Sequence, residues 1–125
     1  MHMKIAEVSK KFDLSQDTLR YYERIGLIPR VGRNSSGIRD YKEKDLGWVE
    51  FIKCMRNAGL SIESLIEYVK LFEEGEHTAG ARKDILFEER EKLRERIAQM
   101  KETLKRLDKK IKGYERCLNK EKELR

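Results

Sequence analysis

The stretch that decides the fold is residues 15–29, which read SQDTLRYYERIGLIP. Ser15 is a good helix N-cap, because its hydroxyl can accept a hydrogen bond from a free backbone N–H of the first turn. Gly26 can take the left-handed conformation that ends a helix, so we expect a helix from Gln16 to Gly26. A shorter amphipathic helix is expected just before it, at 4–12. Two short helices joined by about three residues form a helix-turn-helix unit.

The segment that follows predicts a β-hairpin. Turn-forming residues NSSG at 34–37 separate two short extended runs at 30–33 and 38–41, which is the pattern of two strands joined by a turn. Arginines at positions 30, 33 and 39 lie on this hairpin. We therefore interpret it as a basic wing beside the helix-turn-helix unit.

Two further helices should complete the first domain. One is expected at 44–58, ended by Gly59, and another begins after the N-cap Ser61. The buried stripe of the latter helix is expected to consist of Ile62, Leu65, Ile66, Val69 and Phe72. The fold class is therefore mainly α: a winged helix-turn-helix domain at 1–74, a linker at 75–80 with Thr78 as a helix cap, and a long helix with its tail at 81–125. Met1 and His2 are left out of this interpretation as a possible cloning remnant.

The long last helix carries a heptad repeat. From residue 93 onward the apolar positions are spaced alternately by four and three residues, which is typical of a coiled coil. An alternative is that this helix packs on its own domain, but that arrangement needs a wider apolar stripe. Flanking charges favour an antiparallel homodimer, because Arg94 can then meet Glu115 of the second copy and Lys101 its Asp108. The predicted dimerisation residues are Leu93, Ile97, Met100, Leu104, Leu107, Ile111, Tyr114 and Leu118.

Polar and basic side chains on the second helix and the wing are candidate DNA contacts. Arginine can bind guanine edges in the major groove, and hydroxyl and ammonium groups reach phosphates. The alternative for each residue taken singly is an ordinary solvated side chain. The candidates are Ser15, Asp17, Thr18, Arg20, Tyr21 and Arg24 on the helix, and Arg33, Arg39, Tyr41 and Lys42 on the wing.

Composition agrees with an anionic partner without proving one. The 125 residues are 38% hydrophobic and 42% charged, with a formal net charge of +6. This balance suits nucleic acid, although RNA binding or mere solubility would also explain it. We see neither a membrane-spanning stretch nor an export signal, so we expect a cytoplasmic protein without a membrane partner. Cys54 and Cys117 lack CxxC spacing, so we expect no disulfide framework, no metal site and no cofactor.

At this point the sequence resembles a known family. The motifs TLRYYERIGLIP at 18–29, RDY at 39–41 and DL at 45–46 are similar to the signature of MerR-type regulators. The resemblance implies a homodimer whose antiparallel coiled coil sets two winged domains on a palindromic promoter with an overlong spacer. It further implies that the protein bends and untwists this double-stranded DNA, so that RNA polymerase engages both promoter elements.

The segment FIKCMRNAG at 51–59, with Thr78, Arg82 and the short tail, resembles the branch of the family that senses aldehydes and nitrosative stress through a thiol. The resemblance implies that Cys54 is the sensor of such electrophiles. From the residues alone, a cysteine among apolar neighbours is more often a buried structural residue, and the signal would then be a small molecule or a partner.

Two readings from other classes remain. A coiled-coil interaction protein would use its basic domain only for solubility and would not bind DNA. An enzyme is not expected, because the sequence shows no nucleophile paired with a base and no phosphate-binding loop.

Overall fold

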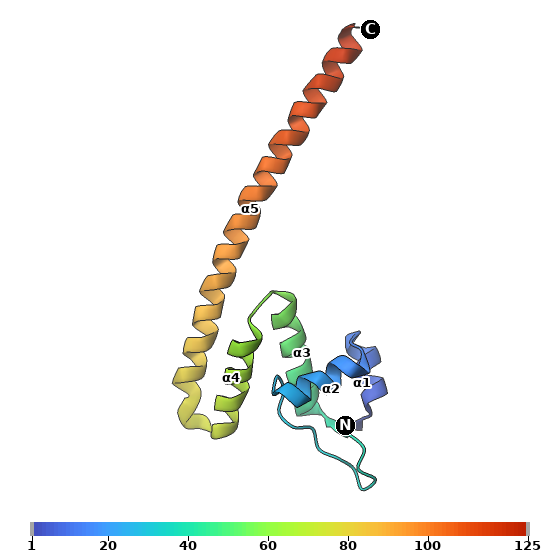
Figure 1. Ribbon diagram of the computed structural model, residues 1–125, viewed down its shortest axis with the longest axis vertical. Helices are drawn as coiled ribbons and strands as arrows, with labels where there is room; N and C mark the ends of the chain where they lie inside the picture. The colour runs from blue at the N-terminus through green and yellow to red at the C-terminus, as the bar shows by residue number, and fades with distance from the viewer. Residues whose placement is uncertain (1, 125) are drawn as a thin grey trace. The chain divides into compact units, whose positions relative to one another are not determined.

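The computed structural model describes residues 2–124 and consists mainly of helices (Figure 1). The chain divides into two compact units, a head that ends at Glu89 and a distal helix that begins at Arg90. The elements in chain order are β1 (His2–Met3), α1 (Ile5–Phe12), α2 (Gln16–Ile25), β2 (Tyr41–Lys42), α3 (Glu43–Asn57), α4 (Ile62–Glu74), the short 3₁₀ helix η1 (Glu76–Thr78) and α5 (Ala79–Leu124).

The helix-turn-helix unit forms as its caps predict. The side chain of Ser15 accepts a hydrogen bond from the backbone N–H of Thr18, with 3.0 Å between nitrogen and oxygen. At the other end Gly26 has a φ of 84°, the left-handed region that a side chain would disfavour. The N–H of Leu27 then returns to the carbonyl oxygen of Tyr22 at 2.8 Å. The predicted start and end of α2 are confirmed.

The wing differs from the predicted two-stranded hairpin. Its two runs meet only at one antiparallel bridge, between Arg33 and Arg39. The turn is held by the Asn34 side chain, whose Oδ1 accepts from the backbone N–H groups of Ser36 and Ile38 at 2.9 and 3.0 Å. All residues from 32 to 38 are exposed. The two runs therefore lack a buried apolar face that would stabilise a longer two-stranded sheet.

The strand that does form near the wing is β2, and its partner is the start of the chain. Tyr41 pairs with Met3 and Lys42 pairs with His2, in antiparallel register. His2 also lies 2.8 Å from Asp40, measured from Nδ1 to Oδ2. Setting His2 aside as a cloning remnant was therefore wrong for the fold, because it contributes backbone pairing to the only sheet within residues 2–124.

Helix α3 begins and ends within one residue of its predicted positions, and α4 begins directly after its predicted N-cap Ser61. Gly59 between them has a φ of 85°, and the Ser61 hydroxyl accepts from the N–H of Ser64 at 3.1 Å. The predicted stripe of α4 is correct for Leu65 and Val69, which are buried. Phe72, at the end of the stripe, is 44% exposed instead, and its ring centre lies 5.0 Å from that of Trp48.

The head has its own apolar core, built from all of its main helices and from the segment between α2 and β2. The buried apolar residues in contact are Val8, Leu19, Tyr22, Leu27, Ile28, Val31, Tyr41, Leu46, Val49, Ile52, Leu60 and Leu65. Several come from loops, so α2 and the base of the wing share one core. The side of α2 that faces solvent is therefore fixed by packing of the opposite side.

The predicted linker at 75–80 contains η1 and the start of α5. Thr78 is buried, and its hydroxyl lies 2.7 Å from the carbonyl oxygens of both Leu71 and Gly75. The first turns of α5 belong to the head, where Glu89 is buried and accepts a hydrogen bond from Ser61 at 2.9 Å.

The distal helix exposes the residues predicted to form the coiled-coil seam. Leu93 is half-buried, and the other seven are exposed in the single chain, with Met100 at 71%. Because they recur along one continuous helix, they form an apolar stripe, and no other part of the distal helix covers this stripe. No helix within residues 2–124 is long and apolar enough to cross a membrane.

Candidate nucleic-acid interface

The outer face of α2 presents the side chains that the sequence assigned to it. Leu19 and Tyr22 are buried in the core, whereas Asp17, Arg20, Tyr21 and Arg24 are exposed. The predicted orientation of the helix is confirmed. Ser15 is exposed at its N-cap and Thr18 is half-buried beside it, which places both at the first turn of α2.

Two arginines on this face make weak contacts within α2. Nη1 of Arg20 donates a hydrogen bond to Oδ1 of Asp17 at 3.0 Å, and the Asp17 side chain is almost fully exposed. The guanidinium carbon of Arg24 lies 5.6 Å from the centre of the Tyr21 ring. Solvated pairs of this kind contribute little to stability, so a base edge or a phosphate can replace them at low cost.

The arginines of the wing are held more firmly. Nε of Arg39 lies 2.7 Å from Oε1 of Glu23, and Nη1 of Arg33 lies 3.3 Å from Oε2 of the same carboxylate. Oε2 also accepts the backbone N–H of Val31 at 2.9 Å. We call these three side chains, Glu23, Arg33 and Arg39, the Glu23 cluster. It joins α2 to both runs of the wing.

The electrostatics of the Glu23 cluster favour the ionised carboxylate. Burial by itself would raise the pKa of Glu23, but the hydrogen bonds from Arg39, Val31 and Arg33 outweigh that effect and hold the pKa below its usual value. Sequence reasoning missed Glu23. The available signal was its spacing of four from Leu19, which puts it at the edge of the buried face of α2.

Tyr41 is not on the surface, which corrects its prediction as a phosphate contact. The residue is 0% exposed, and its hydroxyl makes no hydrogen bond with any part of residues 2–124. Burial raises the pKa of this hydroxyl. Alternation along β2 explains the placement: Tyr41 points into the core, and its neighbour Lys42 is exposed.

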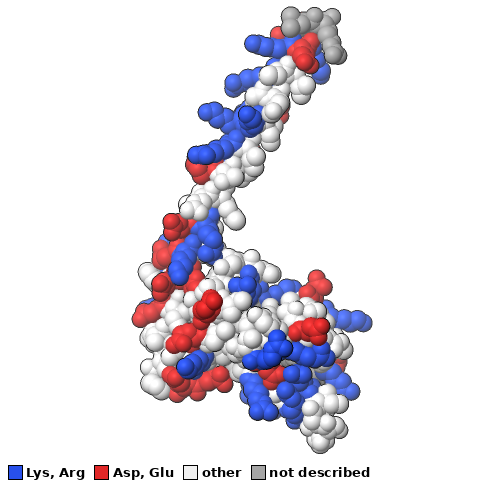
Figure 2. Space-filling view, in the orientation of Figure 1, with Lys and Arg blue, Asp and Glu red and all other residues white. Residues whose placement is uncertain are grey.

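Lysine and arginine side chains gather over one part of the head. Figure 2 shows them crowded where α1, α2 and the wing lie, while aspartate and glutamate side chains gather over α4 and the start of α5. This separation gives the face that carries α2 a positive field, which attracts a polyanion.

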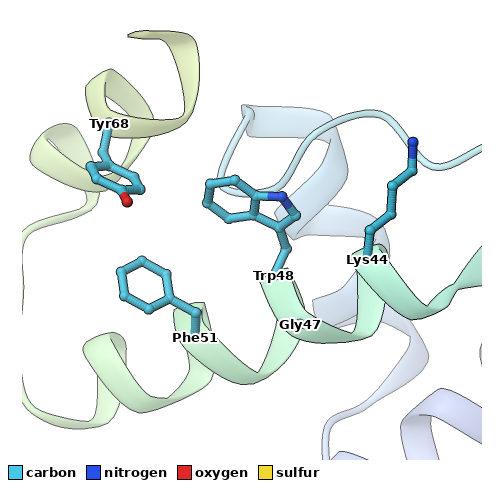
Figure 3. A pocket seen from close by; sticks show the side chains of 5 residues that line it. All are labelled: Lys44, Gly47, Trp48, Phe51 and Tyr68. Atoms are coloured by element: carbon cyan, nitrogen blue, oxygen red, sulfur yellow. The ribbon is translucent and has the colours of Figure 1, made fainter. Parts of the chain in front are cut away.

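A second feature of the head is a shallow aromatic pocket of about 250 Å³ between α3 and α4. Figure 3 shows the rings of Trp48, Phe51 and Tyr68 around it, while the Lys44 side chain points away from them. The ring centres of Trp48 and Tyr68 are 6.0 Å apart. The pocket offers apolar contact and stacking, without a pair of groups suited to acid–base catalysis.

Cys54 on α3 is exposed, so the interpretation of this residue as a buried structural cysteine is wrong. It lines an open depression with Lys11, Phe12 and Lys53, among others. The Lys53 ammonium donates to the carbonyl oxygen of Phe12, which commits it to the backbone at the end of α1. No group of three or more potential metal ligands occurs in the part of the chain that the structure describes.

Capped helices α1 and α2, a short wing and a basic outer face together define the head as a winged helix-turn-helix domain. The chain belongs to the MerR family. A family model described as "MerR HTH family regulatory protein" matches residues 3–71, and a second, described as "MerR, DNA binding", matches residues 46–110. The resemblance drawn from the motifs is confirmed.

Individual relatives agree with this assignment. The chain is 66% identical over 91 residues to the HTH-type transcriptional regulator AdhR of Bacillus subtilis, over 73% of this chain and 65% of that protein, so the match spans just under two thirds of AdhR. A MerR family regulator from Listeria monocytogenes has 53% identity and a TM-score of 0.88, covering 90% of this chain and 86% of its own.

A third relative was solved with DNA. HiNmlR, a MerR family regulator lacking the sensor domain and bound to promoter DNA, has 29% identity and a TM-score of 0.85, covering 93% of this chain and 92% of its own. The similarity to AdhR supports the branch of the family indicated by the sequence around Cys54.

Proposed function

We propose that this protein is a transcriptional regulator that binds double-stranded promoter DNA as a homodimer. The observation that carries the proposal is the exposed polar face of α2, with Arg20, Tyr21 and Arg24, on the positively charged part of a MerR-type head. A MerR family regulator of closely similar structure binds promoter DNA. Such an activity belongs in the cytoplasm, where promoter DNA is found.

In this proposal α2 enters the major groove. Arg20 and Arg24 reach base edges, and Thr18 and Tyr21 contribute hydroxyl groups to phosphates or bases. Ser15 and Asp17 lie at the N-terminal turn of α2, where the end of the helix approaches the sugar–phosphate backbone of the DNA. Lys42, exposed at the end of β2, contacts a phosphate and fixes register without reading sequence.

The homodimer is formed by the distal helix. Its apolar stripe from Leu93 to Leu118 is exposed along a continuous helix, and a second copy running antiparallel covers it while pairing Arg94 with Glu115 and Lys101 with Asp108. The apolar seam supplies most of the stability, because exposed ion pairs contribute little. The two heads are thereby held at a fixed separation, which selects a palindromic operator.

Regulation proceeds in this proposal through deformation of the promoter. The dimer bends and untwists an overlong spacer, so that RNA polymerase engages both promoter elements. Sequence-dependent DNA stiffness would add to the specificity of such binding. A few kcal/mol separates two arrangements of this kind, which is within the reach of a small signal.

The test of DNA binding uses the full chain. Random duplexes are selected by the purified protein, and the enriched sequences are expected to share a palindrome whose half-sites are spaced by a whole number of helical turns. Arg20→Ala is expected to relax the preference at one position of each half-site, with an exposed lysine of α4, Lys70→Ala, as the control. Failure to enrich any sequence at moderate ionic strength would overturn the proposal.

We further propose that Cys54 senses electrophiles, such as aldehydes or nitrosative agents. Its thiol is exposed, as a reactive cysteine requires, and the surrounding segment resembles the thiol-sensing branch. The test compares transcription from the target promoter with and without a reactive aldehyde, for the wild type, Cys54→Ser and the control Cys117→Ser. Induction only in the two proteins that keep Cys54 is expected. Equal induction in all three removes Cys54 from the mechanism and leaves a small-molecule or partner signal.

A further inference from the structure

The Glu23 cluster joins parts of the head that are distant in sequence. Glu23 lies on α2, Arg33 on the first run of the wing, and Arg39 on the second. The side chain of the glutamate is only 8% exposed, whereas those of Arg33 and Arg39 are 30% and 27% exposed. The carboxylate therefore lies beneath the guanidinium groups, and the arginines lie between it and solvent.

We propose that Glu23 is a positioning residue for DNA binding: it holds Arg33 and Arg39 at the base of the wing so that their two guanidinium groups bind one backbone phosphate together. The proposal rests on the proposed DNA binding by α2, the helix that carries Glu23. Glu23 would then support DNA binding, although its negative charge by itself would repel the phosphates of DNA.

The contacts leave both arginines with donors for a second anion. Arg33 directs its two terminal nitrogens to Glu23 and Val31, and its Nε makes no hydrogen bond within residues 2–124. Arg39 uses only Nε toward Glu23, and its two terminal nitrogens make no hydrogen bond within residues 2–124. Because a guanidinium has five N–H donors in a fixed plane, one edge can face the carboxylate and another a phosphate. Two guanidinium groups against one carboxylate also leave the cluster with a net positive charge.

The cluster is anchored to the backbone as well as to itself. Glu23 accepts a hydrogen bond from the backbone N–H of Val31 at 2.9 Å, and Nη1 of Arg33 donates to the carbonyl oxygen of Val31 at 2.6 Å. Val31 is fully buried, so this point of the wing does not move independently of the core. The arginines are thus ordered before DNA arrives, and binding loses less side-chain entropy than it would with free arginines.

Charge and positioning predict opposite signs for Glu23→Gln. If Glu23 were only a negative charge beside DNA, its loss would strengthen binding, because the net charge of the protein rises by one. If it positions the two arginines, the same change weakens binding despite the added positive charge. The sign of the change in affinity therefore separates the two explanations.

The experiment measures binding of fluorescently labelled duplex, carrying the palindrome selected by the wild type, across a series of salt concentrations. Glu23→Gln is expected to weaken binding about tenfold at fixed salt. The matched control Glu67→Gln removes the same charge from the exposed face of α4 and is expected to bind as tightly as wild type or slightly tighter. Binding by Glu23→Gln that equals or exceeds that of the control overturns the proposal.

A second variant keeps the test valid if Glu23→Gln folds poorly, as circular dichroism would show. Arg39→Lys keeps the charge but replaces the planar fork with one ammonium group, which serves either the carboxylate or the phosphate. It is expected to lower affinity about tenfold, while the slope of log K against log salt stays close to that of wild type because Arg33 still neutralises the shared phosphate. Wild-type affinity in this variant overturns the proposal. Absence of selective binding by the wild type overturns the proposed function instead.

Discussion

The head and the distal helix use apolar residues in opposite ways. In the head, residues such as Leu19 and Val49 are buried by other elements of the same chain. In the distal helix, residues such as Leu104 and Leu107 are more than half exposed although they recur with a regular spacing. The head thus buries its apolar residues within one chain, whereas the stripe of the distal helix is exposed in the single chain and is the surface that the proposed dimer would cover.

The largest effect should come from a charge placed in that stripe. Leu104→Glu puts two carboxylates into the seam of the proposed dimer, and we expect the dissociation constant to rise by a factor of about 100 or more. Sedimentation equilibrium at micromolar concentration measures this change. Gln99→Glu adds the same charge at a heptad position outside the seam and should leave the dimer intact. An unchanged dissociation constant in Leu104→Glu would contradict dimerisation through the apolar stripe of the distal helix.

The second prediction compares how the loss of stability in a head variant and in a distal-helix variant depends on protein concentration. Leu19→Ala leaves a cavity in the head and is expected to cost about 2–5 kcal/mol of unfolding free energy at any protein concentration. Leu107→Ala lies in the seam of the proposed dimer, so its loss of stability relative to wild type should be smallest at low protein concentration, where neither protein is dimeric, and should grow to a plateau as the concentration rises. Thermal unfolding of both variants over a range of concentrations measures this. Equal concentration dependence in the two would contradict the division of roles.

A third prediction concerns the pH dependence of the head. The pKa of Glu23 is lowered in the folded head, so its ion pairs contribute stability above the ordinary glutamate pKa of 4.5, and this contribution is lost as the pH falls through the lower, folded value. Glu23→Gln lacks this contribution, so its unfolding temperature should fall less than that of wild type on acidification. Glu67→Gln serves as the control and should follow the wild-type profile.

The smallest effect is expected from the buried hydroxyl of the head. Tyr41→Phe removes a polar group that has no hydrogen-bond partner within residues 2–124, so stability should stay constant or rise by about 1 kcal/mol. DNA affinity should not change. The matched variant Tyr21→Phe removes an exposed hydroxyl from α2 and should weaken DNA binding without altering the unfolding temperature. Reduced DNA binding by Tyr41→Phe would restore Tyr41 as a contact.

Features set by local chemistry were predicted correctly. The N-caps at Ser15 and Ser61, the left-handed Gly26 and the ends of α3 each depend on a few neighbouring residues. The orientation of α2 also followed from the spacing of Leu19 and Tyr22. Exposed DNA-binding candidates on α2 were therefore found, because a helix with one buried face leaves the other face in solvent.

Features that depend on residues far apart in sequence were missed or wrong. Tyr41 was predicted to be exposed like Lys42, but only Lys42 is. A two-residue strand is too short for its sequence to show which face is buried. The wing arginines were treated as free, although Glu23, ten and sixteen residues earlier, accepts hydrogen bonds from both. His2 was set aside, although its strand partner lies forty residues later.

The sequence by itself determined the helices of this protein, their caps, the apolar stripe of the distal helix and the family to which the chain belongs. These features arise from interactions between residues within one or two helical turns. Only the tertiary structure decided that Glu23 ties the wing to α2, that Tyr41 is buried and that Cys54 is exposed. Burial and ion pairing between separate elements depend on how those elements pack, and no local pattern encodes that packing.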